Sequence, residues 1–112
     1  MAEVIITALL EAEINKKFKK ESIKIFSLLH TVGDNPYKGK EVGVIGKILI
    51  KDIKYNKFRF YFITDGYKIK VLKAQELKDL IIKFVRMSEK KDQQETIEEI
   101  KKILRSFGEE GF

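Results

Sequence analysis

Hydrophobic positions follow a helical spacing in the first third of the chain. They recur at intervals of four and seven residues, with lysines between them, at Leu10, Ile14, Phe18, Ile25 and Leu29. This spacing predicts an amphipathic helix, which a break near Ser22 could divide into a helical hairpin. Residues 4–6 are also hydrophobic, and residues 4–7 could begin that helix or form a short strand; we favour the strand.

The spacing changes to alternation after residues 33–36, a Gly-Asp-Asn-Pro cluster that predicts a turn. Alternating hydrophobic and polar residues then predict three strands, at residues 44–51, 57–64 and 67–73. In the middle strand one face carries three phenylalanines, Phe58, Phe60 and Phe62. Arg59 and Tyr61 therefore point to the opposite face. The pair Asp65-Gly66 is typical of a tight hairpin turn, which predicts an antiparallel meander.

Two further segments complete the predicted fold. The hydrophobic positions in residues 75–88 have the spacing of one face of a helix. Residues 80–85 could equally form a buried strand, but the pattern slightly favours the helix. Near the end of the chain, a helical face that Gly108 would terminate is formed by Ile97, Ile100, Leu104 and Phe107. The predicted fold class is α+β: one domain, residues 1–112, with an N-terminal helix or helical hairpin packed on a small twisted antiparallel sheet, and a C-terminal helix.

Composition excludes several classes of site. The 112 residues include no cysteine, which excludes disulfides, thiolate zinc sites and cysteine nucleophiles. His30 is the one histidine, and its place beside two leucines favours a helix cap or a core position. The glycines lack the spacing of a phosphate-binding loop, so we expect no cofactor, and we expect no metal. No hydrophobic run approaches the roughly 20 residues that span a bilayer, so we expect a cytoplasmic protein with no membrane partner.

Positive charge concentrates in the segment predicted to form the sheet. The chain has 23 Lys and Arg against 17 Asp and Glu, a net charge of +6. Residues 41–91 carry a net charge of +7, whereas residues 92–112 carry −3. A localised excess of this kind is typical of a surface that binds a polyanion such as nucleic acid.

The outward face of the predicted middle strand would gather this charge. Arg59 would contact phosphates there, and Tyr61 would stack on a base. The neighbouring strands would add RNA-binding lysines, Lys47 or Lys51 on one side and Lys68 or Lys70 on the other. The alternative, which the pattern alone favours, is that a sheet covered on one side simply has a polar outer face with lysines at its edges.

Three stretches of the chain resemble motifs of one family. Residues 35–40, Asn-Pro-Tyr-Lys-Gly-Lys, are similar to an NP-x-x-GK link between hairpin and sheet. Residues 57–62 are similar to a yR-x-x-Y strand whose arginine faces the active cleft. Residues 84–91 are similar to an F-x-K-K-x-x-K segment, and residues 96–100 are similar to the final helix that follows it. In this order the chain resembles the RelE/ParE-like toxin superfamily, in its RelE or HigB-like branch.

The resemblance implies a function. The RNA-cleaving members are toxins of type II toxin–antitoxin pairs, which cut messenger RNA on the ribosome without a metal and are neutralised by a small acidic antitoxin. In that reaction the 2′-hydroxyl attacks the adjacent phosphate, which requires a base, positive groups on the phosphate and an acid. The resemblance implies the catalytic residues Arg59 on the phosphate, Lys51 or Lys54 as base or second clamp, and Arg86 and Lys90. It also implies that residues 80–86 form a strand.

Two other functions remain open at this level. A non-catalytic nucleic-acid-binding module would use the same face of Arg59, Tyr61 and lysines. A structural or interaction protein would have no affinity for nucleic acid. Other members of the superfamily act on DNA gyrase, so the ribosome or gyrase could be the target, and the sequence leaves the oligomeric state open.

Overall fold

The N-terminal segment forms a strand and then two helices. The structure, a computed structural model, describes residues 2–112. Strand β1 (Glu3–Ile6) leads into helix α1 (Ala8–Phe18), which begins where the Thr7 hydroxyl accepts a hydrogen bond from the Leu10 amide at 3.3 Å. A 3₁₀ turn, Lys19–Glu21, separates α1 from helix α2 (Ser22–His30). The strand at residues 4–7 and the break near Ser22 are therefore both confirmed.

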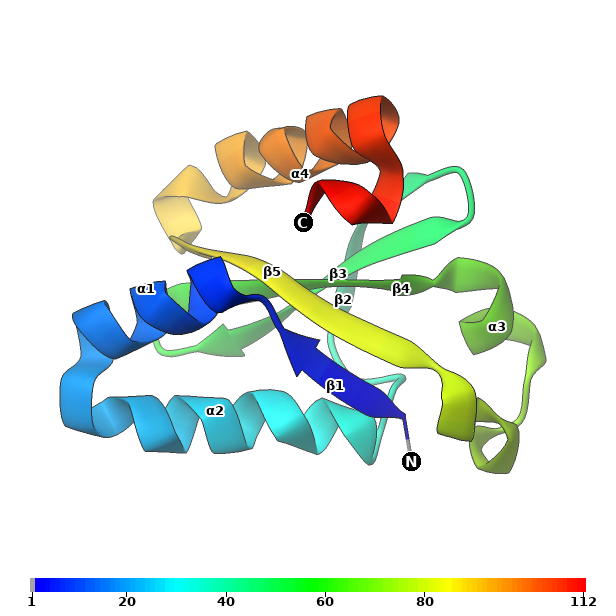
Figure 1. Ribbon diagram of the computed structural model, residues 1–112, viewed down its shortest axis with the longest axis horizontal. Coiled ribbons are helices and arrows are strands. Elements are labelled where there is room, and N and C mark those ends of the chain that lie inside the picture. Colours follow the sequence, from blue (N-terminus) through cyan, green and yellow to red (C-terminus); the bar gives the residue numbers. More distant parts are fainter. Residues whose placement is uncertain (1) are drawn as a thin grey trace.

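The sheet has five strands in the order β1-β5-β4-β3-β2 (Figure 1). Strands β2 (Lys40–Ile45), β3 (Ile48–Tyr55), β4 (Phe58–Asp65) and β5 (Ile81–Glu89) pair antiparallel. Strand β1 pairs with β5 in parallel. The α+β class is confirmed, but the prediction of an antiparallel sheet is wrong, because the sheet is mixed. A strand as short as β1, with four residues, has too little sequence pattern to indicate whether it pairs parallel or antiparallel.

The first predicted strand, residues 44–51, is divided between two real strands. The chain turns at Gly46 and Lys47, and Gly46 adopts a φ of +57°, which favours glycine. The next hairpin, between β3 and β4, turns at Asn56 and Lys57, and Asn56 has a φ of +53°. Asparagine tolerates this left-handed conformation better than most residues. This turn sets the register that places Lys54 opposite Arg59.

The prediction of a third meander strand at residues 67–73 is wrong. The Asp65 carboxylate accepts a hydrogen bond from the Lys68 amide at 3.0 Å and caps a short helix, α3 (Gly66–Val71). Asp65-Gly66 therefore begins a helix instead of closing a hairpin. Since Asp-Gly suits both roles, the dipeptide alone could not distinguish them.

Residues 75–88 form a 3₁₀ helix, Ala74–Asp79, followed by strand β5, so the helix favoured for this segment is wrong. Strand β5 lies between β1 and β4 and is covered on both faces. Phe84 packs on one side and Val85 on the other. A strand covered in this way has a continuous hydrophobic run, which pattern alone does not separate from a helical stripe.

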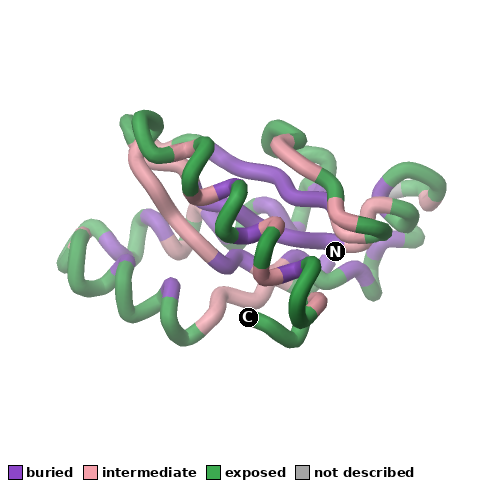
Figure 2. Tube along the Cα trace, turned by 90° about the horizontal axis from the view of Figure 1, so that it is seen from above, coloured by how far each residue is buried: buried purple, intermediate pink, exposed green. Residues whose placement is uncertain are grey.

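Helices cover both faces of the sheet (Figure 1). Helices α1 and α2 pack against Phe60, Phe62 and Phe84, and Phe58 is partly buried on the same side, so the shared face of the three phenylalanines is confirmed. Helix α4 (Gln93–Phe107), which ends at Gly108 as predicted, covers the opposite face. Figure 2 shows the buried strands running between the exposed outer surfaces of these helices. No helix within residues 2–112 has the length and apolarity needed to cross a bilayer.

Candidate functional site

A cleft of about 540 Å³ lies at the end of the sheet where β2 and β4 begin and β3 ends. Five of its lining residues are cations, Lys38, Lys40, Lys54, Arg59 and Lys90. They come from the link before β2, from the three strands β2, β3 and β4, and from the segment between β5 and α4. Gln93, the first residue of α4, also lines the cleft, so the helix begins there. The helix N-terminus adds partial positive charge to that of the side chains.

Asp52 is the one carboxylate among the described residues that line this cleft. Its strand register places it opposite Lys40 on β2 and Tyr61 on β4. The side chain is buried, at 4% exposure, and its Oδ2 atom has no hydrogen-bond partner within residues 2–112. Burial raises the pKa of Asp52, and the positive charges of Arg59 and Lys40 oppose part of that rise. The cleft is therefore lined by five cations and by one buried carboxylate whose Oδ2 has no described partner.

Three of the predicted catalytic residues meet in the cleft. Arg59 is half-buried, and one of its Nη1 hydrogens is donated to the Phe58 carbonyl at 3.3 Å, which leaves further guanidinium donors for a ligand. Lys54 faces it across the β3–β4 hairpin and is exposed. Lys90 is also exposed, and its backbone amide donates to the Lys57 carbonyl at 3.0 Å, which holds the start of the last segment against this hairpin.

Lys51, the other candidate base, does not reach the cleft. It is 5% exposed and lies on the α1 and α2 side of β3, because neighbouring strand residues point to opposite faces. Its Nζ donates to the Tyr37 carbonyl at 2.9 Å and lies 5.9 Å from the centre of the Phe62 ring. Burial lowers the pKa of Lys51, and the charge of Glu41 opposes this. Lys51 therefore connects β3 to the loop that contains Tyr37.

Arg86 lies beneath α4 rather than in the cleft. An irregularity in the β4–β5 register places Val85 and Arg86 on the same side of the sheet, facing α4. The Arg86 Nε donates to Glu99 Oε1 at 2.7 Å, and its Nη1 donates to the Val85 carbonyl at 2.8 Å. The guanidinium also lies 5.1 Å from the centre of the Phe112 ring. These contacts join Arg86 to the C-terminal helix and the residues after it.

The predicted RNA-binding residues do not form one surface. Tyr61 is fully buried under α4, and its hydroxyl lies 2.8 Å from the Ser88 hydroxyl, so the expectation that it faces outward and stacks on a base is wrong. The alternating pattern of β4 does not show that α4 packs on this face. Lys47 and Lys70 line a separate hollow of about 240 Å³ at the opposite end of the sheet, and Lys68 is exposed on α3.

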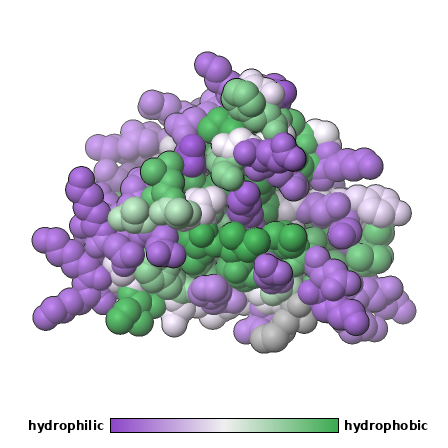
Figure 3. Space-filling view, in the orientation of Figure 1, coloured by the Kyte–Doolittle hydropathy of each residue, from purple (hydrophilic) through white to green (hydrophobic). Residues whose placement is uncertain are grey.

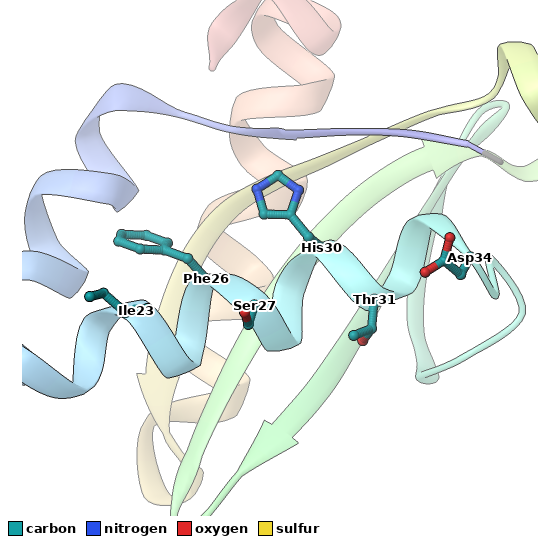
Figure 4. Close-up of a pocket in the computed structure, with 6 residues that line it drawn as sticks. All are labelled: Ile23, Phe26, Ser27, His30, Thr31 and Asp34. Carbon is teal, nitrogen blue, oxygen red and sulfur yellow. The ribbon is translucent and has the colours of Figure 1, made fainter.

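Another hollow, of about 480 Å³, follows the outer side of α2 (Figure 4). Its lining includes Ile23, Phe26 and His30, and the side chains of His30 and Thr31 point away from each other in Figure 4. His30 is exposed at the last residue of α2, so a core position for it is wrong. On the face seen in Figure 3, hydrophilic side chains surround a narrow apolar strip in the middle. Neither the α2 hollow nor the apolar strip is lined by a cluster of cations like that of the cleft.

Sequence reasoning missed Asp52, Lys38 and Lys40. A signal for Asp52 does exist, because an acid between Ile50 and Ile53 interrupts an otherwise hydrophobic and basic strand. Within residues 2–112, no group of three or more His, Asp or Glu side chains is placed to hold a metal ion. Comparisons with protein-family models, with curated proteins and with solved structures found no match.

Proposed function

We propose that the protein is an endoribonuclease of the RelE/ParE-like type, and that the cleft at the end of the sheet holds the RNA phosphate. The observation that carries this proposal is the meeting of five cations from separate segments around one cleft. Three of them, Lys54, Arg59 and Lys90, belong to the set that the family resemblance implies. The order of strand, helical hairpin, sheet and C-terminal helix also supports the resemblance.

The cleft offers the groups that phosphate chemistry needs. When a ribose 2′-hydroxyl attacks the adjacent phosphate, negative charge accumulates on the phosphate oxygens. Arg59 presents a planar fork of donors that matches these oxygens, while Lys54 and Lys90 supply further positive charge. A protonated lysine on the leaving side would return a proton to the 5′-oxygen. The products would be a cyclic phosphate and a free 5′-hydroxyl.

The partners follow from the same proposal. The substrate would be messenger RNA bound to the ribosome, and the protein would be the toxin of a type II toxin–antitoxin pair. A small acidic antitoxin would neutralise it, since a net charge of +6 favours an acidic protein through electrostatic complementarity.

The test is cell-free protein synthesis with mapping of the 5′ ends of the messenger RNA. The wild type should halt synthesis and cut the message, and Arg59→Ala should cut it at least about 100-fold more slowly, because a charge-stabilising donor is lost. Arg105→Ala is the matched control, since it removes the same charge at an exposed arginine near the end of α4, outside the lining of the cleft. Cleavage that Arg59→Ala leaves unchanged would refute the assignment of the site.

One observation favours a second function, RNA binding without turnover. Arg86, one of the cations implied for catalysis, is paired with Glu99 beneath α4 instead of lining the cleft. This alternative expects binding of single-stranded RNA that weakens steeply with salt, and no cut message in the same cell-free assay.

A further inference from the structure

The charges in the cleft are arranged around Asp52 without pairing with it. No ion pair within 4.0 Å joins Asp52 to a described cation, and its Oδ2 has no donor in the part of the chain that the structure describes. A buried acceptor that lacks a donor is costly, because it loses its water and gains nothing in return. Because Asp52 lines the cleft, a bound ligand that brings a hydroxyl to its carboxylate would supply a donor and offset this cost.

The surrounding cations define the kind of ligand. The lysines and Arg59 of the cleft attract a phosphate, whereas the Asp52 carboxylate repels one. The group that meets Asp52 must therefore be a neutral donor beside a phosphate. A ribose 2′-hydroxyl next to the 3′-phosphate of an RNA strand has this chemistry. DNA has the phosphate but lacks the hydroxyl.

We propose that the Asp52 carboxylate accepts the proton of a ribose 2′-hydroxyl in the cleft, and so acts as the base of the cleavage reaction and selects RNA over DNA. This inference rests on the proposed endoribonuclease function and names a residue outside the catalytic set that the family resemblance implies. It replaces the lysines considered as the base: Lys51 lies on the other side of the sheet, and a charged lysine already holds its proton.

Asp52 and a lysine of the cleft can account for both proton transfers of the cleavage step. The proton of the 2′-hydroxyl passes to Asp52 as the 2′-oxygen forms a bond to phosphorus. The bond from phosphorus to the 5′-oxygen breaks, and this oxygen takes a proton from a charged lysine of the cleft. The results are a 2′,3′-cyclic phosphate, a 5′-hydroxyl, a neutral Asp52 and a neutral lysine, which exchange protons with water before the next turnover.

Burial makes Asp52 a better base than an exposed acid, because its raised pKa means that the carboxylate holds a proton more strongly. Tyr61 lies opposite Asp52 on β4, and the charged groups that line the cleft with it are Lys38, Lys40, Lys54, Arg59 and Lys90. The rate of cleavage should therefore fall on the acidic side as Asp52 takes up a proton.

The variant that tests this role is Asp52→Asn, which keeps the shape of the side chain and cannot take up a proton. In the cell-free assay it should cut messenger RNA at least about 100-fold more slowly than the wild type. The residual activity should lose the acidic limb of the pH profile. Asp34→Asn is the matched control, because it makes the same change of charge at an exposed acid outside the cleft.

Binding of RNA and DNA oligonucleotides of one sequence distinguishes a loss of the catalytic group from a loss of folding. Asp52→Asn should still bind the RNA oligonucleotide, which shows that it is folded, but should lose most of the preference for RNA over DNA. Wild-type rates of cleavage in Asp52→Asn, with cleavage abolished in Arg59→Ala, would overturn the role of Asp52 alone. A wild type that cuts no message would overturn the proposed function itself.

Discussion

The Nε atom of Arg86 on β5 lies 2.7 Å from Oε1 of Glu99 on α4, and this ion pair fastens the C-terminal helix to the sheet. The Arg86 side chain is 19% exposed, and Glu99 is the more exposed partner at 53%. The same guanidinium donates to the Val85 carbonyl and lies over the Phe112 ring. Arg86 thus contributes to stability through three kinds of contact.

We expect Arg86→Ala to lower the free energy of unfolding by about 1–2 kcal/mol, since it loses an ion pair, a hydrogen bond and a cation–π contact. Urea unfolding measures this. Arg105→Ala serves as the control, because Arg105 is an exposed arginine on α4, the helix that Arg86 contacts. The two variants should weaken RNA binding equally, through their equal loss of charge. Equal unfolding midpoints, or much weaker RNA binding by Arg86→Ala, would contradict a structural role for Arg86.

The β3–β4 hairpin depends on the backbone of Asn56. Its φ of +53° is in the left-handed region, which alanine adopts at a cost of about 1 kcal/mol or more. Asn56→Ala should therefore destabilise the protein by about 1 kcal/mol, while Asn56→Gly should be nearly neutral. Thermal unfolding compares the two. If alanine and glycine at this position gave equal stability, the turn would not need the left-handed conformation.

The elements with a strong local signal were predictable from the sequence. Spacing of the hydrophobic residues located the helical hairpin and the C-terminal helix, and the alternating phenylalanines located β4 and its core face. Elements whose conformation depends on distant neighbours were not. Asp65 caps a helix instead of starting a hairpin, and β5 is hydrophobic on both faces because it lies inside the sheet.

The site was predictable only in part, for the same reason. Arg59, Lys54 and Lys90 meet because hairpin register brings the first two together and the chain returns to place the third. The burial of Tyr61 could not be predicted, because the pattern of β4 alone does not give the position of α4. Asp52 is buried because β3 is covered in the folded protein, and the burial of β3 cannot be inferred from the residues next to Asp52 in the sequence.

The stability of the protein should depend on pH through Asp52. Burial raises the pKa of this carboxyl above its ordinary value of 3.8, so the native state binds the proton more tightly than the unfolded chain does. The charged form therefore reduces stability above the native pKa, and this effect disappears as the pH falls through that pKa toward about 3.8. Asp52→Asn should be more stable than the wild type near neutral pH.

This difference in stability should shrink as the pH falls. Melting temperatures of the wild type and Asp52→Asn, measured from about pH 8 to pH 4, give the comparison. Asp34→Asn, measured over the same range, corrects for the loss of a negative charge at an exposed position. A difference between wild type and Asp52→Asn that grows toward acid would show that the native carboxyl binds its proton more weakly than the unfolded one.

Lys51 and Lys54 lie three residues apart on β3 and therefore point to opposite faces. Lys54 lines the cleft, whereas the Lys51 amine is held by the Tyr37 carbonyl on the α1 and α2 side. Lys54→Met should weaken binding of a single-stranded RNA about 3- to 10-fold at roughly 0.15 M salt and reduce the slope of log K against log salt by about 0.7. Lys51→Met removes the same charge and should leave most of the affinity intact. Fluorescence anisotropy across a salt series measures both variants, and equal losses would mean that overall charge, not the cleft, governs binding.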